Sequence, residues 1–123
     1  TGHVSFSKVP HALSIENIQT TIELVHRSLR DLFGIGRPRI AVAALNPHGG
    51  EDGIFGDEEI KIIRPAVRAA AMKGIAVSGP FPADSLFHHA AQGDYDAVVC
   101  MYHDQGLIPL KLHHFFGGVA LTL

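Results

Sequence analysis

The chain has 123 residues, 46% hydrophobic and 18% charged, a balance typical of a globular domain with a modest core. Its net charge is −2 with histidine neutral, so no strong field attracts nucleic acid or an anionic membrane surface, and we expect neither as a partner. No apolar run has the length needed to span a membrane. The single cysteine, Cys100, can form no disulfide within the chain, which favours a reducing, cytoplasmic location. Nine histidines are unusual for this length and raise the question of metal binding.

Amphipathic and apolar segments alternate along the chain. Ser14 is a suitable helix cap, and apolar residues follow it at three- and four-residue steps, so the spacing predicts a helix over 14–33. Pro65 falls inside the helix expected over 57–73 and should kink that helix or end its first part. The other expected elements are strands over 38–45, 75–78, 94–101 and 118–123, a rigid turn over 79–84, a short helix over 85–91 capped by Asp84, and a short helix or turn over 105–112. This alternation predicts an α/β fold, with a mainly parallel sheet and helices on both faces, in a single domain over 1–123.

A polar turn follows the apolar strand expected at 97–101. Tyr102, His103, Asp104, Gln105 and Gly106 come in succession where that strand ends. In open α/β sheets, ligands bind at the carboxyl ends of the strands, so this turn is a candidate site. The alternative is structural, with His103 capping the strand and Asp104 capping the following helix.

His48 stands in a glycine-rich loop after the strand expected at 38–45, and His3 lies on a third candidate segment. Neutral imidazoles of His3, His48 and His103 that converge on one point would form a divalent-metal site with open positions for substrate. Acidic residues in the loops could orient the imidazoles; these are Glu51, Asp84 and Asp104. The competing interpretation is that all three histidines are turn and capping residues.

Lys111 ends a mostly apolar run. Its ammonium group could pair with a phosphate or a carboxylate, and the alternative is a solvated surface lysine.

Both ends of the chain suggest a larger protein. The sequence begins without methionine at Thr1 and stops at Leu123 in what reads as a strand. We therefore expect a fragment of a longer chain.

Three stretches together resemble the 4-hydroxythreonine-4-phosphate dehydrogenase family of pyridoxal phosphate biosynthesis. They are Leu-Asn-Pro-His-Gly-Gly-Glu at 45–51, Gly-Pro-Phe-Pro-Ala-Asp-Ser-Leu-Phe at 79–87, and Met-Tyr-His-Asp-Gln-Gly-Leu-Ile-Pro-Leu-Lys at 101–111. They occur in the family's order and at about its spacing. The resemblance runs over 1–123 and covers the middle to C-terminal part of a family chain. It implies the two-domain α/β fold shared with isocitrate and isopropylmalate dehydrogenases.

The resemblance also implies a reaction. The family oxidises a secondary alcohol of a small phosphorylated substrate with NAD, and the β-keto acid then loses its carboxyl group. A divalent metal (zinc, cobalt, manganese or magnesium) would be bound by His3, His48 and His103. Lys111 matches a substrate-contacting lysine, and Asp84 and Asp104 match pocket positions that can relay a proton. The family forms homodimers whose sites are built from both subunits, so His103 would serve the neighbour's metal.

Departures from the family leave alternatives open. Ala120 stands where the family usually has a substrate-binding asparagine, so a relative that oxidises 4-phosphorylated threonate or erythronate is also considered. Phosphate-binding and cofactor-binding segments of the family lie outside this chain, and we expect the isolated 123 residues to be inactive. A metal-dependent hydrolase using the same histidines and a non-catalytic α/β module are the other possibilities.

Overall fold

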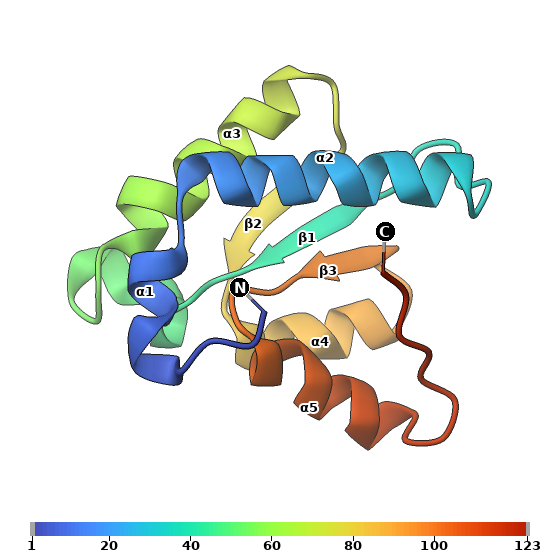
Figure 1. Cartoon of the computed structure of the whole chain (residues 1–123). Helices are drawn as coiled ribbons and strands as arrows, with labels where there is room; N and C mark the ends of the chain where they lie inside the picture. Colours follow the sequence, from blue (N-terminus) through green and yellow to red (C-terminus); the bar gives the residue numbers. More distant parts are fainter. Residues whose placement is uncertain (1, 123) are drawn as a thin grey trace.

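A three-stranded parallel sheet between helical layers organises the computed structural model, which describes residues 2–122 (Figure 1). The strands are β1 (Ile40–Ala43), β2 (Val77–Phe81) and β3 (Ala97–Val99). The helical elements are η1 (Phe6–Lys8), α1 (Val9–Ala12), α2 (Ile15–Asp31), η2 (Pro47–Gly53), η3 (Glu59–Ile63), α3 (Arg64–Met72), α4 (Ala83–Ala91) and α5 (His103–His113). The predicted α/β class with a parallel sheet is confirmed.

The strand order is β2-β1-β3, so β1 is central and pairs with both neighbours. Ile40 lies opposite Val77 on one side and Ala97 on the other, and every residue of β1 is buried. A continuous apolar run is what a strand covered on both faces requires. All carboxyl ends of the strands therefore lie at the same edge of the sheet.

Helices cover both faces, as predicted. On one face, Ile22 of α2 and Ala66 of α3 pack with Ile40 and Val42 in the larger core cluster. On the other face, Leu86 of α4 packs against alternate residues of β1. Figure 1 shows α2 and α3 on one side of the sheet and α4 and α5 on the other.

The helix expected over 14–33 is confirmed as α2. The Asn17 N–H donates to Ser14 Oγ at 3.1 Å, so Ser14 is the predicted cap. The effect expected of Pro65 is also found. The π-helical turn η3 ends at Ile63, two residues before Pro65, and Pro65 lies in the first turn of α3, where proline is tolerated.

The segment 75–84 differs from its prediction. β2 extends through Gly79 and Pro80, which the sequence pattern assigned to a rigid turn. Proline is tolerated there because β2 is an edge strand and needs ladder hydrogen bonds on only one side. Asp84 is not the cap of α4; Pro82 precedes the helix and Asp84 lies in its first turn.

Two other expectations need correction. The helix α5 begins at His103 itself, Tyr102 occupies the cap position, and no side chain caps the helix, so Asp104 is not a cap. The strand expected over 118–123 is absent in 118–122, while residue 123 lies outside the described part. Val119 and Leu121 of this segment are 81% and 64% exposed, because no strand or helix of the described chain covers them.

Within residues 2–122, no helix combines the length and the apolar character needed to cross a membrane.

Candidate functional site

The three sequence motifs follow the three strands at one edge of the sheet. The turn η2 with His48 comes after β1, α4 with Asp84 comes after β2, and α5 with His103 comes after β3. Because β1 is central, the His48 segment leaves the sheet between the other two. This edge is where an open α/β sheet binds its ligands.

The turn that carries His48 has an unusual backbone. Six consecutive residues, 48–53, have positive φ, from 43° to 99°, and three of them are not glycine. Side chains at these angles are disfavoured by about 1–2 kcal/mol per residue. The His48 side chain is exposed, and its ring centre lies 6.0 Å from that of Phe55.

His3 and His103 lie side by side. Their ring centres are 4.9 Å apart, although the two residues are separated by nearly the whole chain. His103 Nδ1 lies 2.8 Å from Asp104 Oδ1, and both side chains are partly exposed. A carboxylate that accepts from Nδ1–H fixes the imidazole tautomer and leaves Nε2 able to bind a metal ion.

The distance between the two ring centres is one that a shared metal ion would allow, although the neighbouring rings of His113 and His114 have the same spacing. Two imidazoles that bind one ion at about 2.0–2.1 Å have ring centres about 4.5–5.2 Å apart for the usual coordination angles. The observed 4.9 Å falls within this range. Residues 2–122 of one chain, however, contain no group of three His, Cys, Asp or Glu side chains that could hold a metal ion. His48 does not join the pair within one chain, and the three-histidine set stays a prediction about the assembled protein.

Asp84 and Asp104 border the same surface hollow, of about 320 Å³, between α4 and α5. The Asp84 carboxylate accepts the Ser85 N–H at 3.0 Å and is otherwise exposed to solvent. Tyr102 and Gln105 also line this hollow. The hollow therefore brings together two of the predicted acidic residues from different strand ends.

Lys111 lies in the last turn of α5, eight residues and about 12 Å along the helix from His103. Its Nζ lies 5.9 Å from the centre of the Phe115 ring. In the described chain it is exposed and does not join the histidine pair.

Two polar residues that the sequence reasoning did not single out hold this edge together. Glu59 of η3 is fully buried and accepts the N–H groups of Leu45 and Asn46. Gln105 donates from Nε2 to the Ala44 carbonyl and accepts the Met101 N–H, both at 2.7 Å. A signal for Glu59 was present, because 59, 63, 66 and 70 follow helical spacing and the last three are apolar.

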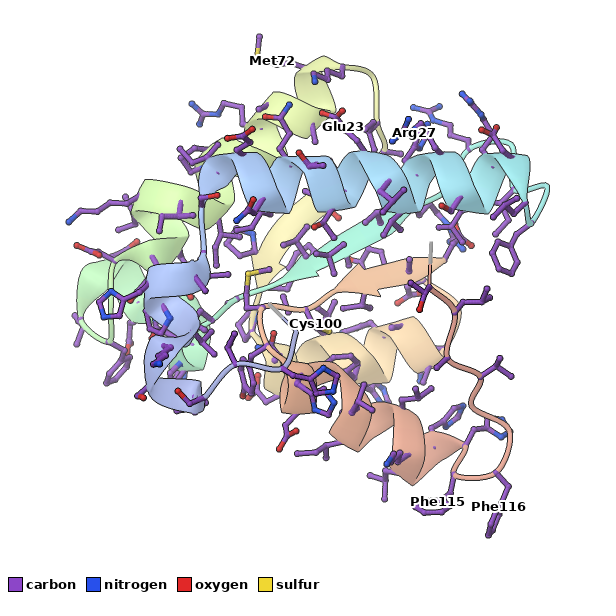
Figure 2. The ribbon with its side chains drawn as sticks, viewed as in Figure 1. Glu23, Arg27, Met72, Cys100, Phe115 and Phe116 are labelled. Carbon is purple, nitrogen blue, oxygen red and sulfur yellow. The ribbon has the colours of Figure 1, made fainter. Side chains whose placement is uncertain are left out.

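Cys100 lies between β3 and this polar turn, near the middle of the molecule (Figure 2). Burial raises the pKa of its thiol to about 11. A thiol with so high a pKa is protonated near neutral pH and is a poor nucleophile.

Comparison with known proteins identifies the class of protein to which this fold belongs. The chain is 58% identical to 4-hydroxythreonine-4-phosphate dehydrogenase of Desulforapulum autotrophicum over 123 residues, and 50% identical over 120 residues to D-threonate 4-phosphate dehydrogenase of Pectobacterium atrosepticum. These alignments cover 100% and 98% of the chain but only 36% of each relative, so the chain spans about a third of their length.

A solved 4-hydroxythreonine-4-phosphate dehydrogenase from Klebsiella pneumoniae superposes with a TM-score of 0.90 at 52% identity, over 94% of this chain and 35% of that one. The fold is therefore that of a dehydrogenase class with an α/β parallel sheet. More narrowly, residues 1–123 match the model of the family described as pyridoxal phosphate biosynthetic protein PdxA, and the chain belongs to that family.

Proposed function

We propose that the full-length protein is an NAD-dependent and divalent-metal-dependent dehydrogenase that oxidises 4-hydroxythreonine 4-phosphate in pyridoxal phosphate biosynthesis. The observation that carries the proposal is the meeting of three family motifs at the carboxyl edge of one parallel sheet. The identity of 58% to a relative of that name supports the substrate. Oxidation of the alcohol gives a β-keto acid, which loses its carboxyl group as carbon dioxide.

In this proposal His3, His48 and His103 hold the metal, which would act as a Lewis acid on the substrate oxygen. Asp104 orients His103 through the 2.8 Å contact to Nδ1, and Asp84 and Asp104 are the candidates for proton transfer from the hollow they border. Lys111 would bind an anionic group of the substrate as a point charge.

We also propose that the protein works as a homodimer. Residues 2–122 of one chain bring no three metal-binding side chains together, and a site built from two subunits, with His103 serving the neighbour's metal, would supply the missing ligand. This arrangement accounts for exposed imidazoles on otherwise well-packed strand ends. Sedimentation of the full-length protein should show a dimer, and a monomer that binds metal with full affinity would contradict this part of the proposal.

The 123 residues alone are proposed to be inactive, because they span about 36% of a dehydrogenase relative. Mixed with NAD, metal and substrate, they should produce no NADH.

A second substrate is favoured by two observations. D-threonate 4-phosphate dehydrogenase of Pectobacterium atrosepticum is 50% identical, and Ala120 stands where the resemblance expects an asparagine. A related 4-phosphorylated hydroxy acid, threonate or erythronate, is therefore the alternative substrate.

One experiment separates these possibilities. NADH formation by the full-length protein should be measured with the amino acid and with the hydroxy acid, before and after removal of metal by a chelator. The preferred substrate is the one with the higher kcat/KM, and activity should be lost with the metal. Release of phosphate or ester cleavage without NAD would instead identify a hydrolase, and failure to bind zinc, manganese or cobalt would indicate a non-catalytic module.

A further inference from the structure

Glu59 is a buried carboxylate with no assigned role. Its exposed fraction is 0%, and it lies on η3, the π-helical turn that follows the His48 segment. A carboxylate at such a position is unfavourable unless it accepts hydrogen bonds. Its two oxygens make contacts that all lead to the segment between β1 and η3.

The Oε1 atom accepts two successive main-chain groups, the Leu45 N–H at 2.8 Å and the Asn46 N–H at 2.7 Å. The Oε2 atom accepts the side-chain amide of Asn46 at 3.0 Å. The other side of the first of these peptide groups is fixed as well, because Gln105 Nε2 donates to the Ala44 carbonyl at 2.7 Å. Two successive peptide groups just before His48, 44–45 and 45–46, are thus held by two buried side chains from different elements.

The same carboxylate also contacts the chain after His48. The backbone of Gly50 comes so close that a Cβ placed there would lie 2.7 Å from Glu59 Oε2 and 2.9 Å from the Gly56 carbonyl oxygen. Gly50 is buried and has a φ of +82°. Glu59 therefore lies against the turn on both sides of the histidine.

The turn has a strained backbone, although it has main-chain hydrogen bonds of its own. Its internal main-chain contacts include Gly49 N–H to the Asn46 carbonyl at 3.2 Å and Phe55 N–H to the Gly50 carbonyl at 3.1 Å. Positive φ angles at the three non-glycine residues, His48, Glu51 and Asp52, oppose this conformation. An exposed imidazole on such a backbone needs a support outside the turn.

We propose that Glu59 is a positioning residue, which fixes the main chain that presents His48 to a divalent metal ion. The inference rests on the proposed function, because it takes His48 as a ligand. Glu59 acts only through the main chain around His48. Outer groups that hold a metal ligand in place typically change metal affinity by about 10–100-fold.

Glu59→Gln tests the proposal in the full-length protein. Glutamine can keep Oε1 as the acceptor of the Leu45 and Asn46 N–H groups, but it removes the negative charge that strengthens both bonds and places an NH₂ group where Oε2 now accepts from Asn46 Nδ2. Glu58→Gln is the matched control: in the described chain Glu58 receives one hydrogen bond, from Asn46 Nδ2 at 2.7 Å, and glutamine can keep it. The probe is cobalt(II), titrated into metal-free protein and followed by its visible absorption.

We expect Glu59→Gln to weaken cobalt affinity about tenfold and Glu58→Gln to leave it within about twofold. The decisive readout is the same substitution made in His48→Ala protein. If Glu59 acts through His48, Glu59→Gln has no further effect on cobalt affinity there. General loosening of the fold would instead weaken affinity in both backgrounds.

Several results would overturn the proposal. They are unchanged cobalt affinity in Glu59→Gln, an equal loss in the His48→Ala background, or an equal loss in Glu58→Gln. If Glu59→Gln does not fold, Glu59→Asp, which keeps the charge but withdraws it by one methylene, is titrated in the same two backgrounds with the same expectations. Wild-type protein that binds no cobalt would refute the proposed function and this inference with it, whereas normal wild-type binding with unaffected variants refutes the inference alone.

Discussion

Replacement of Gln105 by leucine should destabilise the protein far more than its small change in shape suggests. Gln105 is 8% exposed and makes two hydrogen bonds of 2.7 Å, to the Ala44 carbonyl and from the Met101 N–H. Leucine fills a similar volume but can make neither. Loss of a buried hydrogen bond costs about 1 kcal/mol, and about 1–3 kcal/mol where the remaining group stays dry. We expect a loss of about 2–4 kcal/mol in the free energy of unfolding.

The assay is thermal unfolding of the full-length protein, where each kcal/mol corresponds to about 2 °C in Tm, the lower end of the range for 150–250 residues, because the full-length relatives are nearly three times as long as this chain. A drop of about 4–8 °C is therefore expected. Gln92→Leu is the control, because Gln92 is exposed at the end of α4 and bonds only near its own helix. Equal Tm values for Gln105→Leu and Gln92→Leu would refute the argument that the buried amide joins the ends of β1 and β3.

Three further outcomes are expected. Ser14→Ala removes the bond from Asn17 N–H and should lower stability by about 1 kcal/mol, measured by denaturant unfolding. Hydrogen bonds from the Arg39 side chain and main chain lower the pKa of Asp96 below its usual 3.8, so Asp96→Asn should destabilise the protein at neutral pH. The difference in stability between the two proteins should disappear as the pH falls through the lowered pKa, which acid-unfolding curves can measure. Cys100, with its pKa raised to about 11, should resist thiol reagents at pH 8 until the protein unfolds, as peptide mass spectrometry can establish.

Most of the fold could be predicted from the sequence because local signals agreed with tertiary packing. The apolar spacing after Ser14 describes a helix that has one face on the sheet, and α2 matches it to within two residues at its C-terminal end. The apolar run before Asn46 describes a strand covered on both faces. Where the signal was ambiguous, as at Gly79 and Pro80, the edge position of β2 decided the outcome, and strand order is not visible in the sequence.

The candidate site was less predictable. Motifs at strand ends located the right edge of the sheet, but the 4.9 Å approach of His3 to His103 depends on the path of the whole chain. The buried roles of Glu59 and Gln105 were not recognised, because Glu and Gln in helices are usually on the surface. The prediction of a C-terminal strand was wrong because 118–122 have no pairing partner in the described chain. Phe115 and Phe116, just before this segment, project from the molecule (Figure 2).

The positive φ angles of residues 48–52 separate the thermal stability of the protein from the fixed position of His48, two properties that usually change together. Glu51 and Asp52 lie at φ of 43° and 54°, so glycine at either place should relieve about 1 kcal/mol of backbone energy and raise the melting temperature. The same substitutions would make the position of the His48 imidazole more variable, because glycine would allow the turn many more backbone conformations. Under the proposed function, a more heat-stable variant obtained in this way should bind metal more weakly through His48, so stabilising substitutions should be made at other positions.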